Sequence, residues 1–332
     1  MESEGTLLLK RTEIAALLGI EECIAAVEEV FKLYAEGQTM PPGILGLHAR
    51  DGGFHIKAAL LDLNQKTYFA AKTNANFPQN MERFGLPLIQ GVIVLCDGEK
   101  GYPLALMDST EITIIRTGAA TAVAAKYLAR SDATVATICG CGNQGGVSLR
   151  AITKVRRLQK VFAYDRDEAQ AKRFASEFSD ALGIEVQAVR DLARAVGQSD
   201  ICVTCTPSKR FFIKREDVKP GTFIAAVGAD SPEKQELEPT LLKGNKIVAD
   251  ILEQCATIGE LHHAIEMGLV NREDVYAELG DVIAGKKAGR TSDEEIIIFD
   301  STGTALQDVV AAAIVYERAV SAGTGVRLNF GA

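Results

Sequence analysis

The feature that most constrains the fold is a glycine-rich turn between two short apolar runs. A β-branched run over 134–138 predicts a buried strand, which leads directly into the G-x-G-x-x-G sequence of residues 140–145. A helix is expected over 146–158, and a second strand over 161–164 ends at Asp165, 20 residues after the last glycine of the turn. Strand, glycine loop, helix, strand and acid in this order are typical of a dinucleotide-binding βαβ unit.

The positions of this loop suit a pyrophosphate. Gly140 permits the tight turn, Gly142 lets the backbone approach the phosphates, and Gly145 lets the helix pack against the sheet. Asn143 and Gln144 lie where the N–H groups and dipole of a helix N-terminus attract negative charge. The alternative is a glycine-rich turn without a ligand, but the complete context favours a nucleotide site.

The end of the second strand bears on the choice of cofactor. The carboxylate of Asp165 would accept hydrogen bonds from the adenosine ribose hydroxyls and would repel a 2′-phosphate. NAD(H) is therefore the preferred cofactor. Arg166 follows directly and could soften that preference, so NADP(H) stays possible.

Helical and strand-like segments alternate after this unit. In chain order they are expected at 168–181, 186–189, 192–196, 200–204, 221–228, 246–250 and 295–299. This alternation predicts a parallel sheet with right-handed crossovers, so the fold class is α/β with a Rossmann-type doubly wound sheet. Ligands bind beyond the carboxyl ends of such strands, where residues 206–208, 228–230 and 301–304 fall.

Asp230 follows one of these strands and is a candidate acid or base. Lys234 is four residues further on and could pair with it. The alternative for Asp230 is the N-cap of a helix.

The two ends of the chain have a different pattern. The segment 12–36 predicts two helices broken near Gly19, and a long helix is expected over 112–128. The last helix, 305–319, is apolar on one face and is expected to pack on the first domain. Strand-like runs between the first helices predict an antiparallel sheet; they span 54–60, 67–73, 90–95 and 103–107.

Two cations are unusual in these elements. Lys72 has apolar neighbours on its strand, and a buried lysine is costly unless it meets an anion. Arg116 is expected early in its helix, where a cation opposes the dipole unless it faces an anion. The alternatives are a strand-end lysine that reaches solvent and an ordinary surface salt bridge.

Composition excludes several classes of protein. The net charge of −8 argues against non-specific nucleic-acid binding, and no apolar run is long enough to span a bilayer. The first residues lack a signal-peptide pattern, so a cytoplasmic enzyme is expected. Seven cysteines suit reduced thiols, and Cys202 and Cys205 would face opposite sides of a strand, so no metal site is expected.

Together, these segments resemble the ornithine cyclodeaminase/μ-crystallin family over about residues 28–320. The blocks that carry the resemblance, in order, are Lys72, 86–91, 101–108, 115–122, the glycine loop, 200–208, 226–230 with Pro232, and 299–308. The resemblance implies a discontinuous substrate-binding and dimerisation domain, 1–126 with 304–332, around a Rossmann domain, 127–303. It also implies a homodimer.

The resemblance further implies roles for individual residues. Lys72 and Arg116 would bind the substrate carboxylate near the nicotinamide, and Asp230 would be the acid or base, with Lys72 also counted as catalytic. The other candidates for the substrate are Lys57, Gln90, Thr302 and Gly303. The other candidates for the cofactor are Arg116, Thr117, Thr206, Pro207 and Gly228, together with the glycine loop, Asp165 and Arg166.

Departures from the family pattern guide the choice of reaction. Gly43 stands where ornithine cyclodeaminases carry an arginine, and His55 and Lys57 stand where they carry glutamate and methionine. A substrate with a terminal ammonium would meet cations there, while Lys57 could replace the missing arginine. The resulting hypothesis is an NAD(P)-dependent amino-acid dehydrogenase or cyclic-imine reductase. The alternatives are a redox-neutral cyclodeaminase and a nucleotide-dependent binding protein with vestigial catalysis.

Overall fold

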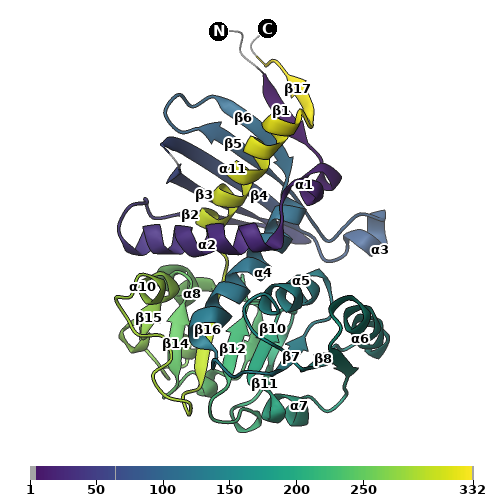
Figure 1. Ribbon diagram of the computed structural model, residues 1–332, viewed down its shortest axis with the longest axis vertical. Helices are drawn as coiled ribbons and strands as arrows, with labels where there is room; N and C mark the ends of the chain where they lie inside the picture. Colours follow the sequence, from purple (N-terminus) through teal and green to yellow (C-terminus); the bar gives the residue numbers. More distant parts are fainter. Residues whose placement is uncertain (1–4, 64, 331–332) are drawn as a thin grey trace. The chain divides into compact units, whose positions relative to one another are not determined.

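The computed structural model describes residues 5–63 and 65–330, and the chain separates into two compact units (Figure 1). The first unit combines the chain up to Arg116 with the segment from Thr304 onward, and the second comprises Thr117–Gly303. The first junction therefore falls inside helix α4 (Ser109–Leu128), earlier in that helix than residue 126, where the sequence analysis placed it.

The first unit is built on a sheet of seven described strands in the order β17-β1-β6-β5-β4-β3-β2. Apart from the parallel pair β1 and β6, the neighbours pair antiparallel, as predicted for the central strands. The bounds are β1 Thr6–Leu9, β2 Gly43–Ala49, β3 Gly52–Leu63, β4 Lys66–Asn76, β5 Ile89–Asp97, β6 Pro103–Asp108 and β17 Val326–Leu328.

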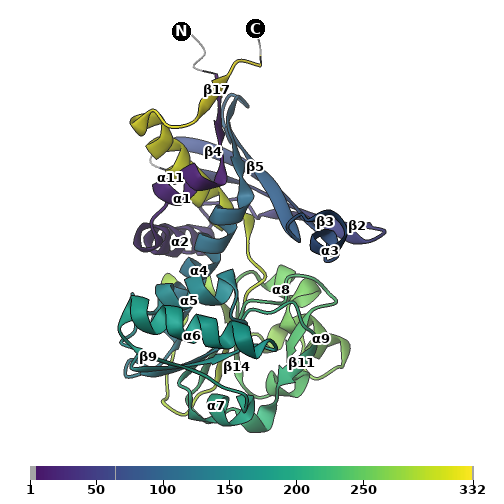
Figure 2. The ribbon, with the colours of Figure 1, turned by 90° about the vertical axis from the view of Figure 1, so that its right-hand side faces the viewer.

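Helices from both ends of the chain cover one face of this sheet. Helix α11 (Ala305–Ala322) contacts β3, β4 and α2 (Ile20–Ala35), so the prediction that the last helix packs on the first domain is confirmed (Figure 2). The break near Gly19 is also confirmed, since α1 (Arg11–Leu17) ends before it. A short helix, α3 (Asn80–Phe84), connects β4 to β5.

One helix boundary corrects the sequence analysis. Helix α4 begins at Ser109 instead of residue 112, so Arg116 lies two turns inside the helix and not at its start. Helix dipole effects are confined to the first and last turns, so the dipole gives no reason for the position of Arg116.

The second unit contains a sheet of eight described strands, in which all the pairs are parallel. The strand order is β15-β14-β16-β12-β10-β7-β8-β9, so the chain continues from β7 through β8 and β9 on one side and then through β10 and β12 on the other. This reversal at β7 confirms the Rossmann-type α/β fold. The bounds are β7 Val135–Cys139, β8 Lys160–Tyr164, β9 Glu185–Ala188, β10 Ile201–Thr204, β12 Phe223–Ala226, β14 Lys246–Ala249, β15 Ala277–Glu278 and β16 Ile297–Asp300.

The sequence analysis missed several short elements of this unit. Besides α5 (Asn143–Ile152), α6 (Glu168–Leu182) and α7 (Leu192–Gln198), the unit holds α8 (Leu252–Ile258), α9 (Glu260–Glu266) and α10 (Leu279–Ile283). Strands β11 (Lys209–Ile213) and β13 (Gln235–Leu237) form a small parallel sheet. These elements are too short for a periodic apolar pattern, and Leu237, Leu241 and Leu261 pack in a shared core instead.

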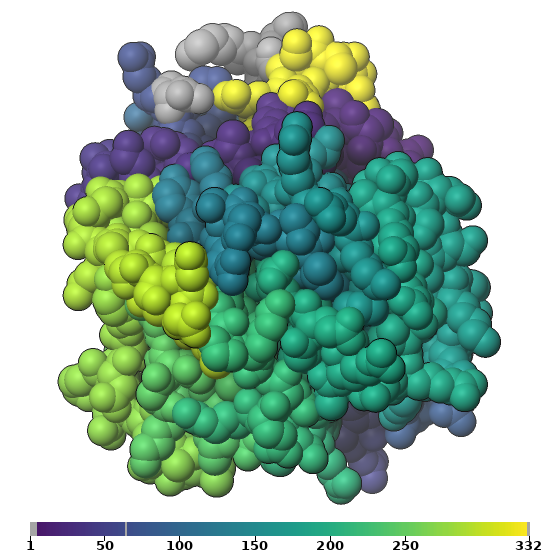
Figure 3. All heavy atoms as spheres, turned by 60° about the horizontal axis from the view of Figure 1, so that its bottom comes forward, coloured from purple at the N-terminus to yellow at the C-terminus, as the bar shows by residue number. Residues whose placement is uncertain are grey.

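Within the second unit, two arginines donate hydrogen bonds to carbonyl oxygens at the carboxyl end of α4. Arg290 Nε donates to the Leu128 carbonyl at 2.9 Å, and Arg156 Nη2 donates to the Ala129 carbonyl at 3.1 Å. In Figure 3 the yellow-green segment that carries Arg290 lies against the blue-teal end of this helix. Carbonyls at a helix end lack partners within the helix, so these arginines have a structural function.

Candidate functional site

The glycine loop after β7 has the geometry of a phosphate-binding turn. Gly140 has φ +102°, and a Cβ at Gly145 would lie 2.0 Å from the Gly140 carbonyl oxygen, so both positions require glycine. A Cβ at Gly142 would meet no atom within 4 Å, which leaves room above the loop. Helix α5 begins at Asn143, three residues before the predicted start, so Asn143 and Gln144 form its first turn.

This turn fits a nucleotide phosphate. The N–H groups of the first helical turn have no partners within the helix and point outward from its N-terminus. Helix α5 ends at Ile152, earlier than the predicted residue 158.

Asp165 lies at the end of β8, beside the loop. Its Oδ2 accepts a hydrogen bond from the Cys141 N–H at 2.8 Å, and its Oδ1 accepts one from the Asp167 N–H at 2.9 Å. The structure thus brings the predicted ribose-binding acid against the predicted phosphate loop, while Arg166 is exposed next to it.

The loops after β10 and β12 are joined by a residue that the sequence analysis missed. Glu236 is completely buried; its Oε1 accepts hydrogen bonds from the Thr206 N–H at 2.6 Å and the Thr206 hydroxyl at 2.7 Å. Its Oε2 accepts one from the Gly228 N–H at 3.1 Å. The predicted cofactor residues Thr206 and Gly228 are therefore held by one carboxylate, and the exposed Pro207 follows Thr206.

In the first unit, three buried cations surround one carboxylate. Lys57 on β3 is directly opposite Lys72 on β4, and both are buried. Lys72 Nζ lies 2.7 Å from Asp308 Oδ2, and Arg116 Nε lies 3.1 Å from Asp308 Oδ1. Arg116 Nη1 also donates to Gln307 Oε1 at 2.8 Å. These residues, Lys57, Lys72, Arg116, Gln307 and Asp308, are called the cation cluster below.

The cation cluster carries more positive than negative charge. Burial lowers the pKa of Lys72 to about 7; Asp308 opposes this shift, whereas Arg116 and Lys57 add to it by repulsion. Burial alone would raise the pKa of Asp308, but Lys72 and Arg116 more than offset that effect and lower it. Like charges directly opposite on neighbouring strands repel each other, and a nearby anion weakens that repulsion.

Asp308 changes how the buried lysine is explained. The sequence analysis assigned the required anion to a ligand, but an internal carboxylate already pairs with Lys72 and Arg116. The alternatives of a solvent-reaching lysine and a surface salt bridge are both wrong, because the two side chains are 3% and 7% exposed. The sequence offered one signal that could have identified Asp308, which is a carboxylate on the strongly apolar face of the last helix.

The remaining residues predicted for the substrate, and Thr117, which was predicted for the cofactor, are not part of the cation cluster. Gln90 on β5 donates from Nε2 to the Pro87 carbonyl at 3.4 Å. Thr302 and Gly303 follow β16, where the Gly303 N–H donates to the buried Asp250 carboxylate at 2.7 Å. Thr117 is buried, and its carbonyl accepts a hydrogen bond from the Thr121 hydroxyl.

Asp230 is exposed beyond the end of β12 and forms the predicted pair with Lys234, at 2.5 Å. The alternative that Asp230 is a helix N-cap is wrong, because no described helix begins directly after it. The Lys234 carbonyl lies 2.8 Å from His263 Nε2, so this segment is also tied to α9.

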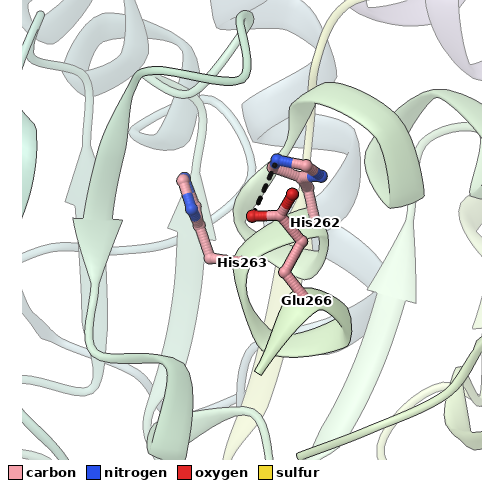
Figure 4. A group of neighbouring side chains, drawn as sticks. All are labelled: His262, His263 and Glu266. Carbon is pink, nitrogen blue, oxygen red and sulfur yellow. Dashed lines mark ion pairs between the residues drawn. The ribbon is translucent and has the colours of Figure 1, made fainter. Parts of the chain in front are cut away.

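His262, His263 and Glu266 form a group that the sequence analysis did not consider for metal binding. Their ligand atoms lie within 4.8 Å of one another on α9 (Figure 4). His262 already pairs with Glu266 at 3.5 Å, and His263 already contacts the Lys234 carbonyl, so the arrangement is explained without an ion.

Cys202 is buried within β10 and Cys205 follows the strand, where its thiol contacts the Gly140 carbonyl at 3.3 Å.

Comparison with known proteins identifies the family. The fold and the glycine loop define a Rossmann-type nucleotide-binding protein, and the model of the ornithine cyclodeaminase/mu-crystallin family matches residues 4–323. The chain belongs to this family.

Its relatives include dehydrogenases and reductases. Alanine dehydrogenase from Archaeoglobus fulgidus is 43% identical over 326 residues, which cover 98% of each protein. The structure of an archaeal alanine dehydrogenase dimer with bound NAD has a TM-score of 0.93 at 43% identity, covering 98% of this chain and 99% of that one. Thermococcus litoralis Δ1-pyrroline-2-carboxylate reductase, in complex with NADH and L-proline, has a TM-score of 0.91 at 33% identity, covering 97% and 100%.

Proposed function

We propose that this protein is an NAD(H)-dependent oxidoreductase that moves a hydride between nicotinamide C4 and the Cα of a small 2-amino or 2-imino acid. The observation that carries the proposal is the cation cluster, in which the buried Lys72 and Arg116 share one internal carboxylate. The buried Gln307 Nε2 beside them has no partner among the described residues, so the cluster also offers an unused donor. An α-carboxylate would accept a hydrogen bond from this donor and would be attracted by Arg116 and Lys72.

Within the cluster, each residue has a distinct function. Arg116 binds the substrate carboxylate and is fixed in position by Asp308 and Gln307. Lys72 and Lys57 supply charge from the sheet, and the lowered pKa of Lys72, about 7, lets it also exchange a proton near neutral pH.

The reaction needs a hydride acceptor and a base. Bound NAD⁺ supplies the acceptor at nicotinamide C4. In oxidation the Cα–H bond breaks and its electron pair leaves with the hydride, the C=N bond forms, and Asp230 takes the proton lost from nitrogen. Reduction of an imino acid reverses each step. Asp230 suits this role because it is half exposed beyond a strand end and is paired with Lys234.

For the cofactor, the proposal assigns the phosphates to the first turn of α5 and the adenosine ribose to Asp165. Thr206, Pro207 and Gly228 would line the nicotinamide half, with Thr117 and Arg116 as further contacts. Asp165→Ser should remove the repulsion of a 2′-phosphate beside Arg166. We expect the ratio of kcat/KM for NADPH to that for NADH to rise by roughly 10- to 100-fold. An unchanged ratio would mean that Asp165 does not select the cofactor.

A redox-neutral cyclodeaminase is the second candidate, because the family model carries that activity in its description. His55 and Lys57 argue against a terminal ammonium, since Lys57 belongs to the cation cluster and would repel it. The third candidate is a binding protein with vestigial catalysis. It gives no reason for Lys72, Arg116 and Asp230 to be present together.

The proposal extends to assembly and location. Leu45 and Leu47 on β2 and Phe54 on β3 are 52%, 52% and 40% exposed, and the register places them beside each other on the sheet. A second copy of the chain would cover them in a homodimer, and Leu45→Glu combined with Leu47→Glu should then give monomers in light scattering. No described helix is long and apolar enough to cross a membrane, and a cytoplasmic location is proposed.

The test follows absorbance at 340 nm with the purified protein. One series offers NADH or NADPH with pyruvate plus ammonia, pyrroline-2-carboxylate or piperideine-2-carboxylate. The other offers NAD⁺ with alanine, proline, ornithine or lysine, with ammonia release assayed in parallel. Steady net turnover of cofactor supports the proposal. Ammonia release from ornithine at constant absorbance would replace it with cyclodeamination, and tight NADH binding without any turnover would support the binding protein.

A further inference from the structure

A buried carboxylate in the second unit joins two loops that lie at the cofactor end of the sheet. Glu236 accepts hydrogen bonds from Thr206 through one oxygen and from Gly228 through the other. Thr206 follows β10 and Gly228 follows β12, and these two strands are parallel neighbours. A Cβ at Gly228 would lie 2.4 Å from Glu236 Oε2, so this contact needs glycine at that position.

The topology places these loops at one half of a dinucleotide. Strand β7, which carries the glycine loop, lies between β8 and β10. Asp165 follows β8, on the side where the adenosine ribose would lie. A dinucleotide extended across the switch point at β7 therefore places its nicotinamide half over β10 and β12, where Glu236 fixes the loops.

Two further buried acids hold Glu236 itself. Glu260 Oε1 accepts a hydrogen bond from the Glu236 N–H at 2.7 Å, and Oε2 accepts one from the Leu237 N–H at 3.1 Å. Asp300, at the end of β16, accepts the N–H groups of Glu260 and Leu261 at the start of α9. Glu260 therefore holds the backbone of Glu236, and Asp300 holds the backbone of Glu260. These hydrogen bonds fix Glu236 relative to the sheet.

We propose that Glu236 is a positioning residue for the nicotinamide half of the cofactor, acting through the loops at Thr206 and Gly228. The inference rests on the proposed NAD(H)-dependent function. Burial raises the pKa of Glu236, and the N–H and hydroxyl donors of the two loops oppose that shift, so its ionised form depends on the contacts that fix these loops. A charged, fully buried side chain is a costly way to join two loops unless their geometry matters.

The test compares NADH with ADP-ribose, which keeps the adenosine, both phosphates and the second ribose but lacks the nicotinamide ring. In Glu236→Gln, the amide nitrogen would face the Gly228 N–H or the Thr206 donors, so one loop loses its acceptor. We expect the Kd for NADH, measured by the fluorescence of the bound nicotinamide, to rise tenfold or more. The Kd for ADP-ribose, measured by calorimetry, should change by less than twofold.

Controls separate positioning from a general structural effect. Glu238→Gln changes a neighbouring, partly exposed glutamate, which accepts a hydrogen bond from the Arg215 N–H, and should alter neither Kd. Thr206→Val removes the hydroxyl that donates to Glu236 and accepts from the Ser208 N–H, but it keeps the Thr206 N–H donor to Glu236. It should weaken NADH binding about threefold without affecting ADP-ribose, and it also serves if Glu236→Gln does not fold. Rescue by Glu236→Asp is not expected, because the shorter side chain cannot reach both loops.

Distinct outcomes overturn distinct claims. Equal weakening of NADH and ADP-ribose in Glu236→Gln, or no change in either, would overturn the positioning role. The same conclusion would follow if Thr206→Val left NADH binding unchanged. Failure of the unaltered protein to bind NADH at all would instead overturn the proposed function.

Discussion

The two units bury charge of opposite sign, and they balance it in different ways. In the cation cluster of the first unit, Lys57, Lys72 and Arg116 face the single carboxylate of Asp308. In the second unit, four buried acids lie behind the loops at the carboxyl end of the sheet; they are Glu236, Asp250, Glu260 and Asp300. We call them the acid array.

The difference lies in what satisfies each group of charges. Members of the acid array accept backbone N–H groups, such as those of Gly228, Leu237, Leu261 and Gly303. Backbone donors are present whether or not a ligand is bound, so the array has a structural function that fixes loops. In the cation cluster, Lys72 and Arg116 are met by the side chain of Asp308, and Gln307 Nε2 has no hydrogen-bond partner among the described residues, so this donor is available to an anionic ligand.

The largest effect is expected from Asp308→Asn. Removal of the carboxylate leaves the buried Lys72 and Arg116 without their shared counter-charge, so the free energy of unfolding should fall by about 3–5 kcal/mol. Urea denaturation measures this change. Pyruvate, as a carboxylate ligand, should restore stability more in the variant than in the unaltered protein. A loss below about 1 kcal/mol would mean that the cluster does not depend on Asp308.

The next effect concerns the acid array and pH. Burial raises the pKa of Asp300 to about 7, whereas an unfolded aspartate titrates near 4, so the folded state holds the extra proton between those values. The contribution of Asp300 to stability is therefore greatest at low pH and is lost as pH rises toward 7.

Asp300→Asn should remove that dependence. Between pH 4 and 7 the unfolding free energy of the unaltered protein should fall relative to the variant by about 1.4 kcal/mol per pH unit. Denaturation curves at several pH values measure the slope. Parallel slopes in the two proteins would show that Asp300 is ionised throughout this range.

A smaller effect is expected for the pH profile of Lys72→Arg. With a Lys72 pKa of about 7, the kcat/KM of the unaltered enzyme should decline about tenfold per pH unit above neutrality, because the neutral amine no longer attracts the substrate carboxylate. Arginine stays protonated, so this decline should disappear in the variant even if its activity is lower. An identical alkaline decline in both enzymes would assign the titration to another group.

The smallest effect is expected from Asp51→Asn, which serves as an exposed counterpart of the Asp308 change. Asp51 pairs with Arg83 at 2.7 Å, and both side chains are 46% exposed. Solvent and salt screen such a pair, so the unfolding free energy should change by less than about 1 kcal/mol. A change as large as that of Asp308→Asn would mean that burial is not the cause of the difference.

Local pattern was enough to predict the Rossmann-type unit. Its strands are buried and apolar, the turn after β7 requires glycine at positions 140 and 145, and Asp165 follows at the expected spacing. The antiparallel strands β3 to β6 and the packing of the last helix were also predicted. Short strands such as β1 and the edge strand β17 were missed, because three or four residues carry no usable periodicity.

The partners of buried charges were decided only by the tertiary structure. The sequence by itself determined that Lys72 and Arg116 needed an anion, since burial of a cation has a cost wherever the chain places it. That this anion includes Asp308, far away along the chain, follows from the packing of α11 on β4. Likewise, no spacing connects Glu236 to Thr206 and Gly228, because that contact exists only when parallel strands bring their ends together.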